Sequence, residues 1–389
     1  MSGTIRRLVR REKMSTEFNV PELAVFQGRT RQSRRAPAEV AAHEDAPLAF
    51  LDEAASLLQI KSFTPHPKFT SGHAQTLAGY YWPRGFLKSA HRGDEARIFE
   101  VEPDVRLLAH CRWQKDRLRQ PTLVLVHGLE GSDTSVYMLG TAEKAFGAGF
   151  NVVRLNLRTC GNTEHLTPTL YNSAHTGDLR AVLRELIEKD GFSSVYLAGF
   201  SMGGNMCLLL AGEDAPNVPK ELKGVCAVSP TIDLNSCAEA IERRTNWLYK
   251  QSFIRSMRKR VLRKRKYFPE LYDTEALSRL RTIRDFDQHY TIVQGGYSSV
   301  DEYYERASSL PLLSKIRTPT LMVHAQDDPF VPFYPFRHPS IAANPYLIFL
   351  APEHGGHVGF VGADTEGEDR FWVENRLVEF CRLTQDKNA

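Results

Sequence analysis

Several features are scarce in this sequence, and each absence excludes a class of protein. No apolar run reaches the roughly 18 to 20 residues that a membrane-spanning helix needs. The basic start of the chain lacks the apolar segment of a secretory signal peptide. With 50 basic and 46 acidic residues, the net charge of +4 is too small to predict nucleic-acid binding. We therefore expect a cytoplasmic protein without a nucleic-acid partner.

Cysteine and cofactor patterns are equally sparse. None of the six cysteines belongs to a Cys-x-x-Cys pair, and no cysteine–histidine cluster has zinc spacing. Several cysteines lie in apolar runs, where a reduced cysteine behaves as a small core residue, and this favours a reducing compartment. The segment from Gly128 to Gly131 has neither the lysine nor the glycine spacing of a phosphate-binding loop. We expect neither a metal ion nor a cofactor.

What is present is an alternation of short apolar segments with helical patterns. The composition, 42% hydrophobic and 25% charged, is typical of a globular protein with a large core. Short apolar strands that are separated by helices predict parallel pairing, with helices on both faces of the sheet. The predicted strands of this kind are 122–126, 151–157, 194–198, 224–229, 320–324 and 346–350.

Other segments depart from that rhythm. Residues 1–45 are polar and arginine-rich, and we predict a disordered basic extension there. Residues 63–83 carry repeated proline and glycine, which predicts a loop. Residues 232–310 are charged and helical, and they predict a helical cap inserted between two parts of the core, 46–231 and 311–389. The predicted fold class is therefore α/β, with a mostly parallel central sheet and an inserted helical cap.

The strongest local pattern surrounds one serine. Gly199-Phe200-Ser201-Met202-Gly203 follows an apolar strand and opens a helix, which is the context of a nucleophile elbow. Small residues two positions before and after Ser201 leave room for the sharp turn that exposes its hydroxyl. The start of the next helix offers free N–H groups and a positive dipole to developing negative charge. The pattern predicts Ser201 as a nucleophile.

A serine nucleophile needs a base, and the base needs a carboxylate that orients it. Enzymes with such an elbow carry these groups in the chain order serine, acid, histidine. The strand 320–324 runs into a loop with two adjacent carboxylates, Asp327 and Asp328. We predict Asp328 as the acid because Asp-x-x-Val-Pro places it in the turn after the strand, and Asp327 is the alternative.

The base is expected after the next strand. The loop that follows residues 346–350 is rich in glycine and contains His354 and His357. Two glycines precede His357 and Gly359 follows it, so the backbone there can approach the nucleophile closely. We predict His357 as the base and keep His354 as the alternative.

The negative charge that develops during acyl transfer requires an oxyanion hole of two backbone N–H groups. Met202, directly after the nucleophile, is expected to supply one of them. The second is expected from the loop after strand 122–126, which reads His127-Gly128-Leu129-Glu130-Gly131-Ser132. Leu129 is the predicted donor, because glycines near it let the backbone turn inward.

A basic stretch within the predicted cap has several interpretations. Eight of the twelve residues in 255–266 are lysine or arginine. Such a run is typical of a solvent-exposed helix face, but a basic helix can also dock on anionic lipid. Nucleic-acid binding is the remaining interpretation.

Several motifs together resemble one branch of a known family. The chain from about residue 60 to 383 resembles the YheT-like α/β-hydrolases, a branch of esterases that includes the yeast medium-chain acyl ester synthases. Residues 1–45 lie outside the resemblance, and Tyr171-Asn172-Ser173 departs from the Tyr-His-Ser that relatives often carry. The segments that carry the resemblance are 63–67, 72–77, 127–132, 301–304 with 308–311, and 357–360.

The resemblance implies an α/β-hydrolase fold and hydrolysis of short- to medium-chain carboxylic esters, acylglycerols among them. It places a catalytic triad on Ser201, Asp328 and His357. Acyl transfer to an alcohol, and phospholipase or acylglycerol lipase activity, use the same acyl-enzyme and stay open. A silent binding protein is disfavoured because no triad member is missing. The acyl chain, the alcohol and the oligomeric state are not predicted.

Overall fold

The computed structural model describes residues 46–85 and 93–385. The extension predicted for residues 1–45 lies outside these ranges. Eight strands of the described chain form one sheet in the order β1-β2-β4-β3-β5-β6-β7-β8. A hairpin of β1 and β2 forms its antiparallel edge, and the other six strands are parallel to one another. The strands are β1 Glu95–Glu102, β2 Val105–Arg112, β3 Thr122–Val126, β4 Asn151–Leu155, β5 Val195–Phe200, β6 Leu222–Val228, β7 Thr320–Val323 and β8 Leu347–Leu350.

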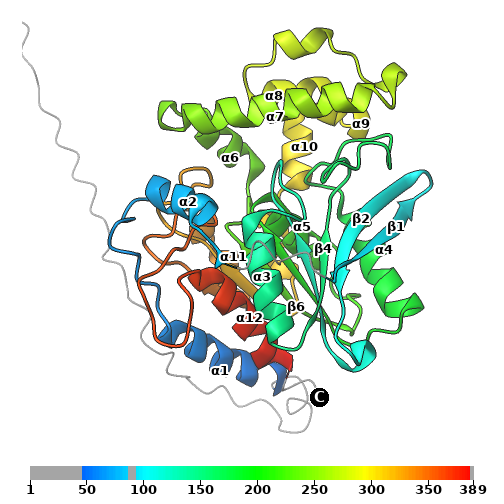
Figure 1. Cartoon of the computed structure of the whole chain (residues 1–389). Helices are drawn as coiled ribbons and strands as arrows, with labels where there is room; N and C mark the ends of the chain where they lie inside the picture. The colour runs from blue at the N-terminus through cyan, green and yellow to red at the C-terminus, as the bar shows by residue number, and fades with distance from the viewer. Residues whose placement is uncertain (1–45, 86–92, 386–389) are drawn as a thin grey trace, which may run out of the picture. The chain divides into compact units, whose positions relative to one another are not determined.

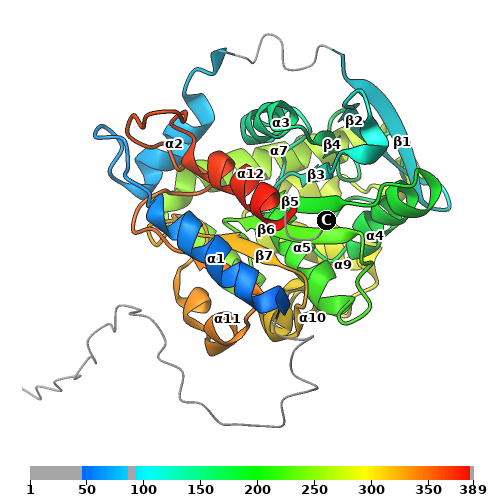
Figure 2. The ribbon, with the colours of Figure 1, turned by 90° about the horizontal axis from the view of Figure 1, so that it is seen from below.

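Helices cover both faces of this sheet (Figure 1). Seen from below, α3 and α12 lie on one side of the strands, and α4 and α5 lie on the other (Figure 2). The helices of the core are α1 Ala46–Ile60, α2 Gly72–Tyr81, α3 Val136–Gly147, α4 Thr176–Arg184, α5 Met202–Glu213, α11 Pro339–Ala343 and α12 Trp372–Gln385. The expected α/β class, with helices on both faces of a mostly parallel sheet, is therefore confirmed.

Each face of the sheet has its own apolar core, because successive side chains of a strand point to opposite faces. In β3, Val124 and Val126 pack into the core on the side of α4 and α5. Leu123 and Leu125 pack into the other core, together with residues of α1, α3 and α12. Burial on both faces explains why the parallel strands read as continuous apolar runs.

The loop predicted for residues 63–83 is wrong in its second half, where α2 forms. Ser71 caps this helix by accepting a hydrogen bond from the Ala74 N–H at 3.3 Å. The glycines of α2 serve close packing. A Cβ on Gly72 would lie 1.8 Å from the Asp327 carbonyl oxygen, and one on Gly79 would lie 2.6 Å from the Gly359 Cα. The sequence pattern failed here because glycine selected for close approach looks the same as glycine in a turn.

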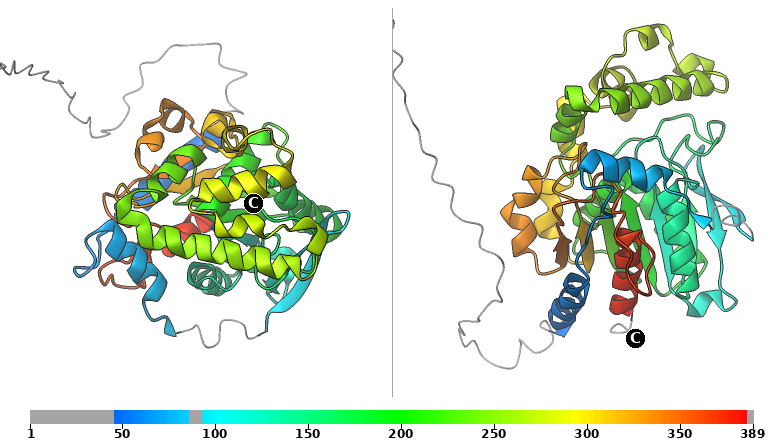
Figure 3. Two further views of the ribbon diagram at one scale, coloured as in Figure 1. Left: turned by 90° about the horizontal axis from the view of Figure 1, so that it is seen from above. Right: turned by 60° about the vertical axis from the view of Figure 1, so that its left-hand side comes forward.

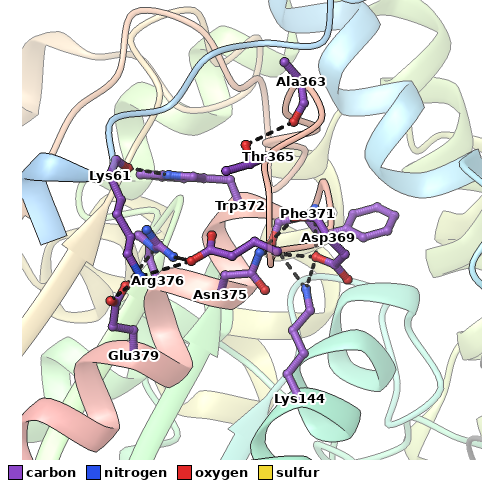
Figure 4. Close-up of polar contacts among 11 residues, drawn as sticks. Lys61, Lys144, Ala363, Thr365, Asp369, Phe371, Trp372, Asn375, Arg376 and Glu379 are labelled. Atoms are coloured by element: carbon purple, nitrogen blue, oxygen red, sulfur yellow. Dashed lines mark hydrogen bonds and ion pairs between the residues drawn. The ribbon is translucent and has the colours of Figure 1, made fainter.

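The C-terminal helix α12 is anchored by polar contacts at its first turns (Figure 4). The Trp372 indole N–H donates to the Lys61 carbonyl at 2.7 Å, and the Lys61 ammonium lies 2.6 Å from a Glu379 carboxylate oxygen. Lys144 of α3 pairs with Asp369 at 2.7 Å. These contacts join the end of α1, the end of α3 and the start of α12, so three separate segments cover one face of the sheet as a unit.

The chain between β6 and β7 is helical and lies over the carboxyl ends of the parallel strands (Figure 3). Its longest helix, α7, packs Ile254, Met257 and Val261 into a cluster with Phe286, separate from the two sheet cores. The predicted boundaries of the cap, residues 232 and 310, stay a prediction. We call the helical chain between β6 and β7 the cap. Its helices are α6 Leu234–Ile241, α7 Trp247–Arg265, α8 Ile283–Phe286, α9 Ile292–Gly295 and α10 Val300–Ala307.

The basic run in α7 is not uniformly exposed. Arg260 is 3% exposed, and Lys264 is fully buried. Lys264 donates to the Glu164 carbonyl at 2.9 Å, and burial lowers the pKa of Lys264 to about 7.

No helix among the described residues is long and apolar enough to span a membrane.

Candidate active site

The predicted site residues follow four of the six parallel strands, β3, β5, β7 and β8. Ser201 comes directly after β5, and Asp328 and His357 lie in the loops after β7 and β8. The predicted oxyanion loop follows β3, which pairs with β5. Carboxyl ends of parallel strands share one edge of a sheet, so these loops converge there and the cap lies above them (Figure 1).

Ser201 occupies a strained backbone position between β5 and α5. Its φ is 54° and its ψ is −122°, a conformation that residues other than glycine rarely adopt. The Ser201 N–H donates to the Val228 carbonyl of β6 at 2.8 Å, which ties the turn to the sheet. A Cβ on Gly199 would lie 2.2 Å from the Gly203 carbonyl oxygen. Gly199 is therefore required by the tight turn, and Gly203 is required by the close approach of α5 to the end of β3, where a Cβ would lie 2.5 Å from the Val126 carbonyl oxygen.

Ser201 lies within hydrogen-bonding distance of His357, and His357 lies within hydrogen-bonding distance of Asp328. The Ser201 Oγ is 2.9 Å from the His357 Nε2, and the His357 Nδ1 is 2.8 Å from the Asp328 Oδ2. An ionised carboxylate only accepts hydrogen bonds, so the proton of neutral His357 resides on Nδ1. The Nε2 lone pair then faces the serine hydroxyl, which is the arrangement that a general base needs.

Asp328 is held in place independently of His357. Its Oδ1 accepts hydrogen bonds from the Phe330 N–H at 2.8 Å and the Val331 N–H at 3.0 Å. Burial raises the pKa of Asp328, but His357, His324 and the Val331 N–H together outweigh burial, and the pKa lies below its ordinary value. A carboxylate in this state can orient His357 and stabilise its protonated form.

Asp327 and His354, the alternative acid and base from the sequence, contact each other and not the three residues above. Asp327 Oδ2 lies 3.2 Å from the His354 Nδ1, and its Oδ1 accepts from the Gly356 N–H at 2.8 Å. The His354 side chain is 42% exposed. Asp327 and His354 thus tie together the two loops that carry Asp328 and His357.

The predicted oxyanion loop makes a tight turn beside the nucleophile. The Gly131 N–H donates to the Gly128 carbonyl at 3.0 Å, which leaves Leu129 and Glu130 at the centre of the turn. The Gly128 N–H donates to the Tyr137 hydroxyl, and the Glu130 N–H donates to the Tyr171 hydroxyl. In the described part of the chain, the Leu129 N–H between them has no hydrogen-bond partner.

Below this turn, a buried histidine fixes the first peptide of the loop. His127 Nδ1 lies 2.8 Å from the Gly128 carbonyl oxygen, and its Nε2 accepts from the Leu157 N–H at 3.1 Å. These partners require a proton on Nδ1 and none on Nε2. Burial lowers the pKa of His127 to about 4, so the ring stays neutral near pH 7.

Helix α2 supports the histidine loop, a role that sequence reasoning missed. Thr76 Oγ1 accepts from the His357 N–H at 2.9 Å. Gln75 is fully buried; its Oε1 accepts from the Val361 N–H at 2.7 Å, and its Nε2 donates to the Val361 carbonyl at 3.0 Å. A serine cap at residue 71 followed by adjacent glutamine and threonine was the available signal, and the surrounding glycines obscured it.

A cavity of about 130 Å³ lies beside Ser201 and is lined in part by the cap. Its apolar walls come mainly from α6, α7 and α8. The cavity is also lined by Tyr171-Asn172-Ser173, the segment that differs from the Tyr-His-Ser of many relatives. The cap residues that line it include Leu234, Ile241, Phe253, Met257, Arg260, Phe286, Asp287 and Tyr304.

Comparison with known proteins defines the class. A family model described as the alpha/beta hydrolase fold matches residues 121–361. "Putative esterase YheT" of Escherichia coli (strain K12) is 30% identical over 321 residues, which is 82% of this chain and 92% of that protein. The chain therefore belongs to the α/β-hydrolase fold family, in the branch that contains YheT. The predicted family is confirmed, and so is the predicted class of enzyme, an ester hydrolase.

Two further relatives match a smaller share. "Phospholipase ABHD3" of Mus musculus is 30% identical over 247 residues, 63% of this chain and 60% of that protein. "Monoacylglycerol lipase" of Saccharomyces cerevisiae is 30% identical over 281 residues, 69% of this chain and 60% of that protein.

Within residues 46–85 and 93–385, no group of three or more histidine, cysteine, aspartate or glutamate side chains is arranged to hold a metal ion.

Proposed function

We propose that this protein hydrolyses short- to medium-chain carboxylic esters through an acyl-enzyme on Ser201. The observation that carries the proposal is the row of contacts from the Ser201 Oγ through His357 to Asp328, at 2.9 and 2.8 Å. Hydrolysis of p-nitrophenyl esters of graded chain length tests the proposal. Absence of hydrolysis across the whole series would contradict it.

In the proposed first step, the Ser201 Oγ attacks the ester carbonyl carbon while His357 Nε2 takes the hydroxyl proton. The carbonyl oxygen gains negative charge and is stabilised by the N–H groups of Leu129 and Met202. The intermediate then expels the alcohol, which receives the proton from His357. Water, deprotonated by His357, attacks the acyl-enzyme, and the acid is released as His357 returns the proton to the Ser201 Oγ.

An alcohol can replace water in the second step, and the product is then a new ester. Gas chromatography of reactions with and without added ethanol separates acyl transfer from hydrolysis. We favour hydrolysis because the curated relatives that match this chain are named as an esterase, a phospholipase and a lipase.

The acyl group is proposed to occupy the cavity beneath the cap. Pockets for drug-sized ligands commonly enclose about 300 to 1,000 Å³, so a cavity of about 130 Å³ favours a short or medium chain. The names of the mouse and yeast relatives favour a lipid ester as the substrate class.

Met257→Trp is expected to shift the chain-length preference to shorter acyl groups. Met257 is 2% exposed and lines the cavity, so the larger indole would fill space that the acyl chain needs. We expect kcat/KM for an octanoate ester to fall about tenfold or more, because even one methylene in an apolar pocket is worth about 10- to 200-fold. Hydrolysis of the acetate ester should change little.

Leu262→Trp is the matched control for this prediction. Leu262 lies on the same helix but is 50% exposed and is absent from the cavity wall. An unchanged chain-length profile in Met257→Trp would place the acyl chain elsewhere.

We also propose peripheral contact with anionic lipid through the outer face of α7. Leu248, Arg255, Lys259, Leu262 and Lys266 are exposed and recur at intervals of three to seven residues, which places them on one face. Residues 247–266 contain no acidic side chain. Exposed apolar residues beside basic ones are typical of a helix that lies in the membrane interface.

Reversing Arg255, Lys259 and Lys266 to glutamate is expected to weaken binding to vesicles that contain phosphatidylserine. Each basic residue near an anionic surface contributes about 1 kcal/mol, so the affinity at low salt should fall by about tenfold or more. Hydrolysis of a soluble acetate ester should stay unchanged. Vesicle sedimentation measures the binding.

The control reverses Lys115, Lys220 and Lys315, which are exposed and precede β3, β6 and β7 at the opposite edge of the sheet. Equal sedimentation of both triple variants and the wild type would contradict the lipid contact.

A further inference from the structure

One ion pair connects the cap to the oxyanion loop. Arg260 projects from α7, and its Nη1 lies 2.8 Å from the Glu130 Oε1. The exposed fractions of the two side chains are 3% and 9%. A buried charge is costly unless it is paired, so the two side chains hold each other in place across 130 residues of chain.

Further contacts fix both partners. The Arg260 guanidinium carbon lies 4.3 Å from the centroid of the Tyr171 ring. The Tyr171 hydroxyl donates to Glu130 Oε1 at 2.9 Å and accepts from the Glu130 N–H at 2.8 Å. Ser256, one turn before Arg260 on α7, donates to Glu130 Oε2 at 2.5 Å. Glu130 is thus bound through its backbone and through both carboxylate oxygens.

The backbone of Glu130 explains why these contacts are needed. Its φ is 58°, in the left-handed region that favours glycine, at the third position of the turn from Gly128 to Gly131. A glutamate persists in such a conformation only when its surroundings hold it there. The Leu129 N–H belongs to the Gly128–Leu129 peptide, one peptide earlier in the same four-residue turn, so whatever holds Glu130 also restrains that N–H group.

Resting on the proposed function, we infer that Arg260 and Glu130 are positioning residues, through which the cap orients the Leu129 N–H toward the oxyanion. Neither side chain contacts the reacting atoms. The pair acts by keeping the turn at Gly128–Gly131 in its strained form, so the oxyanion hole is complete only when α7 is docked on the core.

The test compares Arg260→Met and Glu130→Gln with the wild type on a short, soluble p-nitrophenyl ester. Loss of a whole oxyanion donor costs about 10²- to 10³-fold in kcat, and a misdirected donor should cost about tenfold or more. We expect KM to change less than about twofold, because the interaction is made in the transition state. Glu130→Gln keeps the shape of the side chain, so this variant still tests the role of the ion pair if Arg260→Met fails to fold.

A second measurement reports on the oxyanion hole directly. A trifluoromethyl ketone adds to the serine and places an oxyanion in the hole. Its affinity should fall by the same factor as kcat in both variants. Arg260→Lys retains the charge and should keep more of the activity than Arg260→Met. The double variant Arg260→Met/Glu130→Gln should lose less than the product of the single losses, because both changes break one pair.

Arg263→Met is the matched control. Arg263 lies on the same helix, is 47% exposed and pairs with Glu164, which is not part of the turn at Gly128–Gly131. It should keep the wild-type kcat and inhibitor affinity.

Wild-type kcat in both Arg260→Met and Glu130→Gln would overturn the inference. A raised KM with unchanged kcat would also overturn it, because Arg260 would then serve only as a wall of the acyl cavity that it lines. Failure of the proposed function gives a different result, since the wild type itself would then hydrolyse no ester or would keep its activity without Ser201.

Discussion

Ser201→Ala is expected to lower kcat for ester hydrolysis by about a millionfold, a loss of the size seen when the nucleophile of a serine protease is removed. The substitution removes the hydroxyl oxygen that lies 2.9 Å from His357 Nε2 and that would carry the acyl group in the proposed mechanism. The fold should persist, because the turn rests on the glycines at 199 and 203 and on the backbone bond to Val228.

Two measurements check this expectation. Initial rates with a p-nitrophenyl ester give the loss in activity, and a fluorophosphonate probe should label the wild type but not the variant. Ser252→Ala, an exposed serine on α7, is the control and should be labelled as the wild type is. Activity within tenfold of the wild type in Ser201→Ala would show that another residue is the nucleophile.

The second large effect is expected at the acid. Asp328→Asn should lower kcat by about 10⁴-fold, because an amide can donate to Nδ1 and thereby stabilise the tautomer with the proton on Nε2. The Nε2 would then no longer accept the serine proton. The amide also lacks the negative charge that stabilises protonated His357. Burial makes this loss larger, since no solvent can replace the carboxylate.

Asp327→Asn is the matched control, since it changes the adjacent carboxylate in the same way. Asp327 contacts His354 and the Gly356 N–H, so we expect a loss of less than about tenfold, through small movements of the loop. Steady-state kinetics on both variants decides between them. A larger loss in Asp327→Asn would mean that the wrong carboxylate has been assigned as the acid.

Prediction from sequence worked best where the determinant is local. The elbow around Ser201 is defined by five consecutive residues between a strand and a helix. The parallel strands could be located because strands that are buried on both faces are short, continuous apolar runs. Prediction failed at α2, where the glycines at 72 and 79 are explained by the backbone of distant loops, at Asp327 and Gly359.

The basic run of α7 shows a second limit. Arg260 and Lys264 lie on the same helical face as Met257 and Val261, so helical periodicity could have shown that they are buried. Periodicity could not have shown their partners. Arg260 meets Glu130 and Lys264 meets the Glu164 carbonyl, about 100 to 130 residues away in the chain.

The sequence by itself determined the α/β class, the family and the order in which serine, acid and histidine follow one another. These properties depend on residue type, local spacing and the hydrophobic period, all of which can be read along the chain. Only the tertiary structure decided which of two adjacent aspartates meets His357, which helix supports the histidine loop, and which arginine of the cap pairs with Glu130. Each of these depends on where separate segments meet after folding, and that is set by the packing of the whole sheet and cap rather than by any local pattern.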